Sequence, residues 1–317
     1  MEYVQLGRLG VRVSRICLGT AFRGQRDDAV AARVIERAVD LGCNFIDCAN
    51  YYGRGRSETV LGKAIRGQRD DLFLTSKVWS RMGPGPNDAG SSRYHITREV
   101  ERSLRRLGTD RIDLYLLHNW DPDSPLDESL RAMDDLVRQG KVLYVGACNF
   151  TAAQTLEGLW TADRLGLDAI ACLQNEFNLL HRWPVESELL SLVRSRGLGL
   201  MTYSPLAVGL LTGGYRRGQP PAAGSYWEGR EDFESTMEGI DGVVRCLIDI
   251  GSRLGRTPAQ VALAWLLDHP EVTAPMIGPD LPEHVDETFG ALGWPLPPED
   301  RAALDAATEA APARRYP

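Results

Sequence analysis

Short apolar runs alternate with amphipathic segments along most of the chain, and this alternation predicts the fold. Eight runs have the length and composition of buried strands, at residues 16–18, 44–47, 72–77, 113–117, 142–147, 169–173, 198–202 and 272–277. Apolar residues recur at helical spacing between them, over residues 28–41, 57–66, 97–107, 127–139, 152–164, 184–196 and 257–268, and again near 283–290. Strands that alternate with helices predict βα units and a parallel sheet.

Eight βα units within 317 residues fit a closed (β/α)8 TIM barrel, so we expect an α/β protein with a single domain over residues 1–317. A doubly wound sheet is the alternative architecture. It is disfavoured because no predicted strand is followed by a G-x-G-x-x-G fingerprint and the sequence contains no Walker A motif. Residues 2–13 predict a small N-terminal β-hairpin, with Gly7 and Gly10 at its turn.

Three segments lie outside the eightfold pattern. Residues 205–240 are rich in glycine, proline and charge, and predict a long loop after strand seven, of the kind that usually serves function. Residues 241–255 predict an extra helix at the end of this insertion. The tail, residues 297–317, begins with a predicted C-terminal helix at Pro298 and ends in an Ala/Pro/Arg segment that we expect to fray.

Composition narrows the functional class. A hydrophobic content of 43% and a charged content of 25% are ordinary for a soluble enzyme, and a net charge of −7 argues against nucleic acids and anionic membranes as partners. The sequence shows no signal-peptide pattern and no run long enough to span a membrane, so we expect a cytoplasmic protein. The cysteines lack paired or zinc-binding spacing, so we expect reduced thiols and no metal site, at residues 17, 43, 48, 148, 172 and 246.

Polar residues close the predicted strands, at the end that carries the active site in α/β barrels. Strand two ends at Asp47, with Tyr52 on the loop that follows and Ser57 as the expected N-cap of the next helix. Strand three ends at Lys77 and strand four at His118. Each of the four has an ordinary structural interpretation when taken alone. These interpretations are a cap for Asp47, an amphipathic ring for Tyr52, a snorkelling side chain for Lys77 and a structural histidine for His118.

Together, the four side chains make chemical sense as a tuned general acid. An ammonium beside a phenol is expected to lower the pKa of the phenol from about 10 toward the working pH. A carboxylate keeps a buried lysine charged, and a histidine can orient a carbonyl oxygen. We therefore expect Tyr52 to donate a proton, with Lys77 and Asp47 tuning the phenol and His118 positioning the acceptor oxygen.

The stretch DCANYYGRGRSETVLGKAI, residues 47–65, resembles the D-T-A-x-x-Y-G-x-G-x-S-E-x-x-L-G signature of the aldo-keto reductases. The segments GACNF, LQNEFNLL and YSPLAVGLLTG are similar to further blocks of this family, so the resemblance covers almost the whole chain. The spacing is most similar to the bacterial and potassium-channel-β-subunit-like branch. The resemblance implies a catalytic tetrad of Asp47, Tyr52, Lys77 and His118, and a nicotinamide cofactor whose hydride attacks a carbonyl carbon while Tyr52 protonates the oxygen.

The same resemblance implies where the cofactor and substrate bind. Asn149 and Gln174 are expected to hold the nicotinamide carboxamide, and the ring of Tyr203 to stack on the nicotinamide. The other expected cofactor contacts are Gly19, Thr20, Asp47, Cys148, Ser204, Pro205, Leu206, Gly209, Gly278, Asp280, His284 and Glu287. Aromatic walls are usual in small-molecule pockets, so we expect the substrate to meet Phe22, Tyr51, Tyr52, Trp79, His118 and Trp120.

Three positions depart from the family pattern where the 2′-phosphate of NADP is expected. Gly214 stands where relatives often carry a lysine, and Asp280 and His284 replace other residues after strand eight. An acidic side chain at this position repels the 2′-phosphate of NADP. An acidic side chain that hydrogen-bonds the ribose 2′-hydroxyl is a known feature of NAD-binding sites. We expect NADP or NAD as cofactor, NADPH by the family pattern and NAD(H) by the local residues. Arg216 and Arg217 are either substitute phosphate contacts or a solvated charge run.

These observations favour an NAD(P)H-dependent oxidoreductase that reduces an aldehyde, ketone or keto-sugar to an alcohol. Two alternatives stay open on the same fold: a sugar epimerase or isomerase that retains its cofactor, and a nucleotide-binding regulatory subunit. The substrate itself cannot be identified from the loops that select it, which are residues 79–95, 119–126 and 205–240. We expect a small-molecule carbonyl substrate as partner, without nucleic acid or membrane, and a monomer or homo-oligomer.

Overall fold

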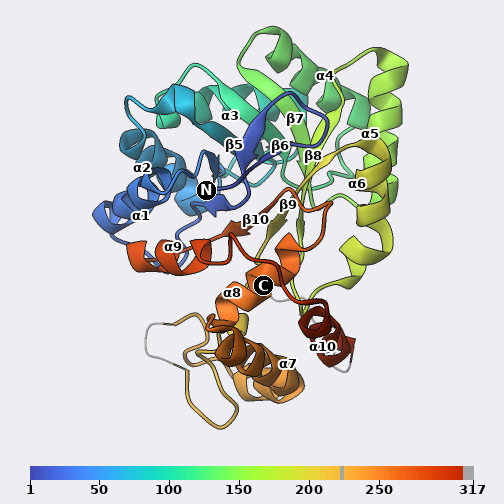
Figure 1. The fold of residues 1–317 in the computed structure, drawn as a ribbon. Helices are drawn as coiled ribbons and strands as arrows, with labels where there is room; N and C mark the ends of the chain where they lie inside the picture. The colour runs from blue at the N-terminus through green and yellow to red at the C-terminus, as the bar shows by residue number, and fades with distance from the viewer. Residues whose placement is uncertain (222–224, 310–317) are drawn as a thin grey trace.

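A closed parallel barrel forms the centre of the computed structural model, which describes residues 1–221 and 225–309 (Figure 1). Its strands follow one another around the ring in the order β10-β3-β4-β5-β6-β7-β8-β9. Their bounds are β3 (Cys17–Gly19), β4 (Phe45–Asp47), β5 (Phe73–Val78), β6 (Ile112–Leu117), β7 (Val142–Cys148), β8 (Ile170–Glu176), β9 (Gly199–Tyr203) and β10 (Ala274–Ile277). The predicted (β/α)8 barrel is confirmed.

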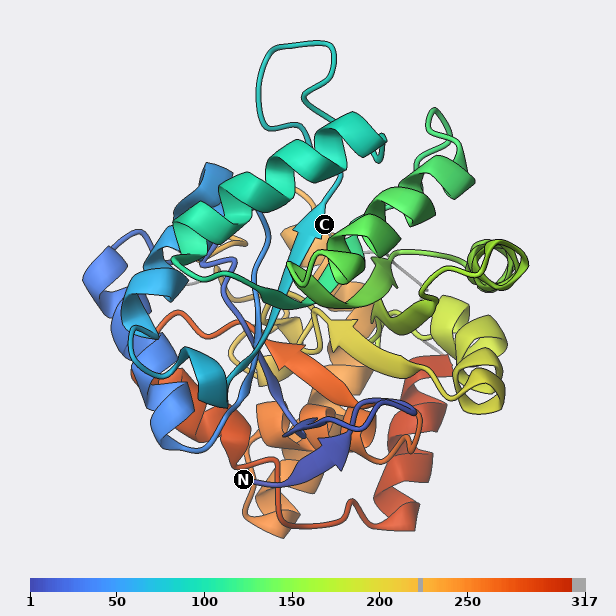
Figure 2. The same ribbon diagram turned by 90° about the horizontal axis from the view of Figure 1, so that it is seen from above.

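Helices surround the barrel, as the view along its axis shows (Figure 2). Those that follow the barrel strands are α1 (Asp28–Asp40), α2 (Arg56–Ala64), α3 (Arg93–Leu107), α4 (Leu126–Arg138), α5 (Ala152–Leu165), α6 (Leu190–Arg196), α8 (Pro258–Leu267) and α9 (Pro282–Phe289). Their apolar stripes face the strands; α3, for example, buries Ile96, Val100 and Leu104. Capping boxes at Thr151 and Thr257 begin α5 and α8.

The insertion after β9 is more helical than the sequence predicted. Helix α7 spans Phe233–Leu254 rather than 241–255, because its buried face extends backward through Phe233, Met237 and Ile240. The segment predicted as a loop over 205–240 is therefore a loop only up to residue 232, and residues 222–224 of it lie outside the described residues. Helix α10 (Pro298–Glu309) begins where it was predicted; the rest of the predicted tail, residues 310–317, also lies outside the described residues.

The expected N-cap at Ser57 is wrong. Helix α2 begins one residue earlier, at Arg56, and its N-cap is Gly55 with a left-handed φ of 94°. Ser57 lies inside the first turn, buried, with its hydroxyl 2.8 Å from the hydroxyl of Thr20. Ser57 therefore joins α2 to the end of β3, because a hydroxyl partner on the barrel is available where the helix enters it.

The predicted N-terminal hairpin closes one end of the barrel. Strands β1 (Tyr3–Gln5) and β2 (Arg12–Ser14) pair antiparallel, and the N–H of Arg8 in the turn donates to the carbonyl of Gly197, 2.8 Å away. Gly7 has a φ of 54°, and a Cβ there would lie 2.4 Å from the nitrogen of Gly199. Only glycine fits this close approach at the start of β9.

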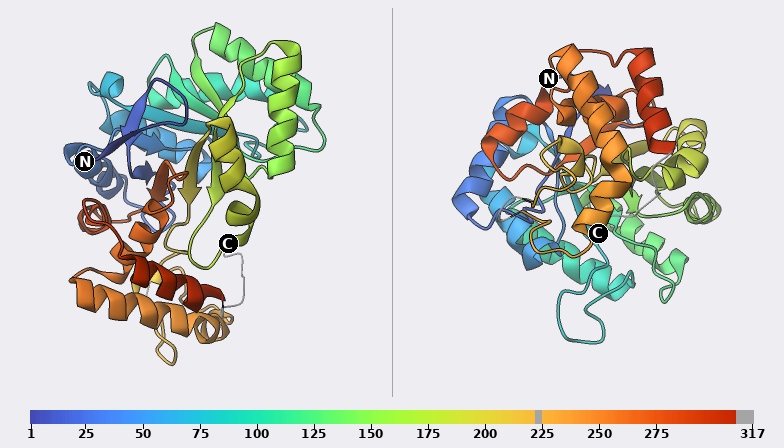
Figure 3. Two further views of the ribbon diagram at one scale, coloured as in Figure 1. Left: turned by 45° about the vertical axis from the view of Figure 1, so that its right-hand side comes forward. Right: turned by 90° about the horizontal axis from the view of Figure 1, so that it is seen from below.

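The two ends of the barrel are covered differently. The hairpin lies in front of the barrel in the view from above (Figure 2), whereas α7 and the loop before it lie in front in the view from below (Figure 3, right). The carboxyl ends of the strands therefore open toward α7. The loop between β5 and α3, residues 79–92, projects beyond the ring of helices (Figure 2).

The barrel interior is apolar and rich in sulfur. Its buried side chains come from the hairpin and from all eight barrel strands, and they are Leu6, Val13, Cys17, Phe45, Phe73, Leu114, Leu116, Cys148, Cys172, Met201, Ala274 and Met276. All six cysteines are unpaired; five are buried and Cys246 is half-buried. Within residues 1–221 and 225–309, no helix has both the length and the apolar character needed to cross a membrane.

Candidate active site

Lys77 contacts two other residues of the predicted tetrad, Asp47 and Tyr52. It lies in β5 beside β4, and its ammonium forms an ion pair with the carboxylate of Asp47; both side chains are fully buried. The same nitrogen donates to the carbonyl of Cys48 at 2.9 Å and to the phenol oxygen of Tyr52 at 3.2 Å. An ammonium, a carboxylate and a phenol thus meet at the carboxyl ends of neighbouring strands.

His118 completes this cluster. It is the first residue after β6, where its N–H donates to the carbonyl of Val78 at 2.9 Å. Its ring packs edge-on against the ring of Tyr52, with centroids 5.9 Å apart and an interplanar angle of 80°. The structure therefore brings together all four predicted residues of the tetrad, on β4, the loop after it, β5 and the end of β6.

Burial and the partner's charge shift the pKa values of Asp47 and Lys77 in opposite directions. Burial raises the pKa of Asp47, and the nearby charge of Lys77 opposes this rise. Burial alone would lower the pKa of Lys77, but the charges of Asp47 and Tyr52 outweigh burial and raise it. Lys77 is therefore held as an ammonium at neutral pH, opposite an ionised carboxylate.

The expected lowering of the pKa of Tyr52 is wrong in this structure. Burial raises the pKa of Tyr52 to about 12, which outweighs the opposing effect of the Lys77 ammonium. The neighbouring charge can be inferred from the sequence, whereas the removal of the phenol from water depends on the folded structure. The consequence favours acid chemistry all the same, because a phenol with this pKa carries its proton throughout the neutral range.

His118 is neutral for the same physical reason. Burial, aided by the positive charge of Lys77, lowers the pKa of His118 to about 3. The imidazole therefore carries one N–H and one acceptor nitrogen at neutral pH. Its Nδ1 is buried without a hydrogen-bond partner among the described side chains and backbone. A neutral imidazole beside a protonated phenol provides two groups that can hydrogen-bond to one substrate oxygen.

A second layer of polar side chains, on β8 and after β7, contacts the tetrad. Gln174 of β8 donates from its amide nitrogen to Asp47 at 2.8 Å. Asn149, after β7, donates from its amide nitrogen to the carbonyl of His118 at 3.0 Å, and its carbonyl oxygen accepts from the phenol of Tyr203 at 2.8 Å. Two of the three residues assigned to the nicotinamide, Gln174 and Asn149, thus each contact a tetrad member, and the third, Tyr203, contacts Asn149.

The remaining hydrogen-bonding capacity at this layer fits a nicotinamide carboxamide. The amide nitrogens of Asn149 and Gln174 are engaged with His118 and Asp47, whereas each side-chain oxygen keeps a lone pair beyond its recorded contacts. Both oxygens can therefore accept from the NH2 of a carboxamide. Cys148 adds a thiol 3.3 Å from the amide nitrogen of Asn149; burial raises the pKa of this thiol to about 12, so it stays neutral.

The chain after β9 turns sharply over the barrel end. Ser204, Ala207 and Val208 all have left-handed φ values, of 52°, 47° and 54°, and Gly209 follows at 88°. Left-handed backbone is costly for a β-branched residue and persists where the surroundings impose it, most often at ligand sites. This turn contains the predicted cofactor contacts Ser204, Pro205, Leu206 and Gly209, and the carbonyl of Ser204 is held by the side chain of Asn178 at 3.0 Å.

Asp280 has partners that the sequence did not reveal. Its carboxylate accepts from the backbone N–H groups of Gly24 and Gln25, while the Gln25 side chain donates to the Asp280 carbonyl at 3.0 Å. Burial raises the pKa of Asp280, opposed by His284 and by these backbone donors. The two predicted adenosine-side residues Gly278 and His284 are exposed, so this edge of the site is open to solvent.

The arginines proposed as substitute phosphate contacts are engaged elsewhere. Arg216 donates to the carbonyl oxygens of Gly213 and Tyr215, and Arg217 pairs with Glu238 of α7. Glu287 of α9 is half-buried, and its carbonyl accepts from Gln260 at 2.9 Å. The Arg217 contact ties the loop to α7, and the Gln260 contact ties α9 to α8.

Gly19 and Thr20, the predicted cofactor contacts at the end of β3, also have structural roles. Gly19 ends β3 in a place where a Cβ would approach Met276 to 2.9 Å. Thr20 donates to the carbonyl of Asp47 from both its backbone and its hydroxyl, at 2.9 Å each. Thr20 therefore holds the end of β4, and a cofactor contact at these two residues stays a prediction.

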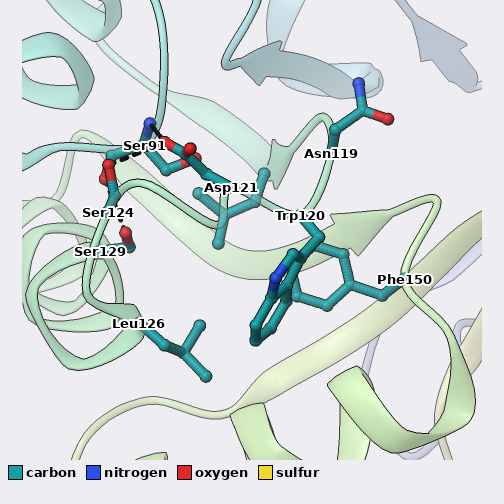
Figure 4. Close-up of a pocket in the computed structure, with 9 residues that line it drawn as sticks. Ser91, Asn119, Trp120, Asp121, Ser124, Leu126, Ser129 and Phe150 are labelled. Carbon is teal, nitrogen blue, oxygen red and sulfur yellow. Dashed lines mark hydrogen bonds between the residues drawn. The ribbon is translucent and has the colours of Figure 1, made fainter.

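The aromatic residues expected around the substrate differ in their surroundings. Phe22 is buried with a φ of 46°, Tyr51 is 50% exposed and Trp79 is half-buried. Trp120 packs edge-on against Phe150, with ring centroids 5.3 Å apart, and both line a small cavity together with Ser91, Asp121 and Ser129 (Figure 4). This packing supports the loop after β6; a substrate contact for Trp120 stays a prediction.

Sequence reasoning missed two buried carboxylates behind the tetrad. Glu58 of α2 and Glu99 of α3 are both fully buried. Glu58 accepts from Ser76, the neighbour of Lys77, at 2.6 Å, and Glu99 accepts from Asn50, between Asp47 and Tyr52, at 3.2 Å. The available signal was a charged residue on the apolar face of each helix: Glu99 falls between Ile96 and Val100 of α3, both of which are buried.

Comparison with known proteins identifies the family of the chain. The model of the Aldo/keto reductase family matches residues 15–309. The chain is 39% identical over 304 residues to the uncharacterized oxidoreductase YrpG of Bacillus subtilis (strain 168), covering 92% of this chain and 91% of that one. It is 36% identical to probable voltage-gated potassium channel subunits beta of Oryza sativa subsp. japonica, over 99% of this chain and 98% of that one, and of Arabidopsis thaliana, over 92% and 91%. The chain therefore belongs to the aldo/keto reductase family and is an oxidoreductase of the predicted bacterial and channel-β-subunit-like branch.

Proposed function

We propose that the protein is an NAD(P)H-dependent reductase that converts an aldehyde, ketone or keto-sugar carbonyl to an alcohol. The observation that carries this proposal is the contact between Lys77 and Tyr52, 3.2 Å between nitrogen and phenol oxygen, with Asp47 paired behind it. A buried ammonium beside a protonated phenol stabilises the phenolate that forms once the proton has left. The same cluster therefore contains the proton donor, Tyr52, and the ammonium of Lys77, which stabilises Tyr52 after its proton has left.

The residues perform distinct parts of this reaction. When bound, the nicotinamide supplies a hydride for the carbonyl carbon. Tyr52 hydrogen-bonds the carbonyl oxygen and transfers its proton to that oxygen as negative charge develops. His118, held neutral by burial, directs a second hydrogen bond to the same oxygen, and Lys77 stabilises the phenolate that remains on Tyr52. Asp47 keeps Lys77 charged and in place.

The residues that would hold the cofactor lie at the ends of β7, β8 and β9 and on the turn after β9. Asn149 and Gln174 would accept from the carboxamide NH2, Tyr203 would offer its ring to the nicotinamide, and the turn from Ser204 to Gly209 would provide the remaining contacts. We infer that NAD(H) is accepted at least as well as NADP(H), because Asp280 places a carboxylate at the adenosine edge and Gly214 offers no charge. Asp280, His284 and Glu287 complete this edge in the proposal.

Two features of the protein's setting belong to the same proposal. We infer a single catalytic domain over residues 1–317 that works in the cytoplasm on a small-molecule carbonyl, as a monomer or a homo-oligomer. Supporting observations are the net charge of −7 and the closed barrel that holds every proposed catalytic residue. Nucleic acid and membrane surfaces play no part in this function.

A regulatory role is the second candidate, because two of the relatives are named as potassium channel subunits beta. In that role the protein would bind the nucleotide and act through a partner. The intact tetrad favours turnover instead, since a binding subunit has no need of a proton donor at 3.2 Å from an ammonium. A cofactor-retaining sugar epimerase or isomerase would use the same tetrad and is distinguished by its product.

One assay separates these functions. The purified protein is mixed with NADPH or NADH and a panel of aldehydes, ketones and keto-sugars, and cofactor oxidation and product are followed together. A reductase forms one alcohol for each cofactor oxidised, and Tyr52→Phe loses most of kcat while still binding cofactor, because the ring remains and the proton is gone. Product without net cofactor oxidation would indicate the isomerase, and binding without turnover across the panel the regulatory subunit. Parental turnover by Tyr52→Phe would remove Tyr52 as the donor.

A further inference from the structure

The loop that carries Tyr52 is anchored to the outer helix layer by one side chain. Asn50 lies between Asp47 and Tyr52, is fully buried, and donates from its amide nitrogen to one carboxylate oxygen of Glu99, 3.2 Å away on α3. The other carboxylate oxygen of Glu99 accepts from Arg102 at 2.7 Å. A charged acceptor makes this hydrogen bond stronger than one between neutral groups. The contact joins the loop after β4 to a helix that follows the next strand.

The backbone hydrogen bonds of this loop lie mostly within the loop itself. The N–H of Cys48 donates to Thr75 of β5 at 2.9 Å, but those of Tyr52 and Arg54 donate to Ala49 and Tyr51, at 3.2 and 2.8 Å. The position of the Tyr52 ring relative to the barrel therefore also depends on side-chain contacts around it. Asn50 provides such a contact two residues away, on the side of the loop that faces α3.

Packing alone does not explain why a carboxylate, Glu99, occupies this position of α3. Glu99 is fully buried on the apolar face of α3, where burying a charge without partners is unfavourable. Its recorded partners lie on its own helix, with the exception of Asn50 on the catalytic loop. The oxygen of the Asn50 side chain is buried without a partner among the described residues, so Asn50 is held there through its contact with Glu99.

We propose that Asn50 and Glu99 are positioning residues for the proton donor. Their hydrogen bond fixes the loop so that the phenol of Tyr52 stays at 3.2 Å from Lys77, and α3 thereby sets the geometry of the acid. Neither residue contacts substrate or cofactor in this role. The inference rests on the proposed function, because it takes Tyr52 as the donor. The parallel contact of Glu58 with Ser76 anchors the neighbouring strand beside Lys77.

The first test removes the donor of this hydrogen bond. Asn50→Ala is expected to lower kcat ten- to hundred-fold, roughly the cost of displacing a catalytic group by an ångström, with the KM for the nicotinamide cofactor unchanged. Asn50→Asp, which sets two carboxylates against each other, should be at least as damaging. Adding Glu99→Gln to Asn50→Asp restores an amide–carboxylate hydrogen bond in reversed order, and we expect it to recover most of kcat.

A matched control separates positioning from loss of stability. Asp134 of α4 is another buried carboxylate, paired with Arg138 and accepting from the N–H of Asp168 at 2.9 Å, on a helix that carries no catalytic contact. Asp134→Asn should lower the thermal midpoint of unfolding as Asn50→Ala does and leave kcat of the folded protein unchanged. Equal losses of kcat in both variants would overturn the proposal.

Hydrogen exchange gives a readout that does not depend on turnover. Asn50→Ala should speed amide exchange several-fold in a peptide covering residues 48–55, with exchange in α4 unchanged; unaltered exchange in that peptide would overturn the proposal. A normal kcat in Asn50→Ala, together with an inactive Tyr52→Phe, would also overturn it and leave the proposed function intact. If Tyr52→Phe instead turns over at the parental rate, the proposed donor is wrong, and the positioning role falls with it whatever the loop does.

Discussion

Gln174 and Asp47 form a hydrogen bond of 2.8 Å across the full width of the barrel. Gln174 lies on β8 and Asp47 on β4, and three strands separate these two in either direction around the ring. The amide therefore reaches the carboxylate from the side opposite to Lys77. Asp47 is fixed between an amide donor and an ammonium, and this arrangement points the Lys77 ammonium toward Tyr52.

Removing the Gln174 amide should loosen Asp47. We expect Gln174→Leu, which has a similar volume, to lower the free energy of unfolding by about 1.5–3 kcal/mol, the usual value of a hydrogen bond to a charged group. Gln174→Glu should destabilise more, because it would bury a second carboxylate against Asp47. Urea unfolding of the three proteins at pH 7.5 measures the differences, and equal stability of Gln174→Leu and the parent would contradict this reading of the contact.

Breaking the buried ion pair should cost stability and activity separately. Lys77→Met leaves Asp47 buried without its cation, and we expect a loss of about 3–5 kcal/mol in the free energy of unfolding, together with loss of turnover. Adding Asp47→Asn removes the stranded charge, so the double variant should regain stability without regaining activity. Measured unfolding and kcat for the single and double variants check both statements. Turnover by Lys77→Met with an unshifted pH profile would exclude the role given to Lys77.

His118 should make the protein less stable in acid. Its pKa is about 3 in the folded chain and near 6.5 when unfolded, so between these values the unfolded chain binds one more proton. The free energy of unfolding therefore falls as the pH drops from 6.5 toward 3, by at most about 1.4 kcal/mol per pH unit from this residue. His118→Gln should remove this contribution, seen as a shallower pH dependence in urea unfolding between pH 6.5 and 4.5. Parallel curves for the two proteins would contradict the prediction.

Asp280 should weaken the preference for NADP. Its charge opposes a 2′-phosphate, and allowing for solvent exposure we expect an effect of about ten-fold, or 1.4 kcal/mol. Asp280→Asn keeps the acceptor oxygen for Gly24 and Gln25 but removes the charge, so it should tighten NADPH binding and leave NADH binding unchanged. Asp280→Arg should shift the preference further. Fluorescence quenching measures each Kd, and NADPH binding a hundred-fold tighter than NADH to the unmodified protein would refute the reading of Asp280.

The pattern of apolar runs was sufficient to predict the barrel and the meeting of the strand-end residues, because both depend on which residue ends each strand. Asp47, Lys77 and His118 could be assigned from the sequence since parallel strands place their carboxyl ends together. The start of α7 at Phe233 was missed because proline and glycine before it obscured the helical period.

The features that the sequence did not predict depend on how side chains pack in the folded chain. The pattern of apolar and polar residues does not specify this packing. The raised pKa of Tyr52 depends on how much water the folded site excludes, which no neighbour in the sequence specifies. The contact of Asn50 with Glu99 joins residues 49 positions apart, and the partners of Asp280 lie more than 250 positions away. Such side-chain partners become visible only when the loops around the barrel are placed in space.

The hairpin at the closed end of the barrel has a consequence for how the chain folds. Its turn is held by the bond from Arg8 to Gly197, and Arg15, just after β2, donates to the carbonyl oxygens of Leu267 and Thr273. The hairpin thus finds its partner only after the chain has been made as far as Gly197, and Arg15 only after it has been made as far as Thr273. Closing such long loops is entropically costly and slow. The amino-terminal segment should therefore be the last to become protected, well after the middle strands have paired with their neighbours.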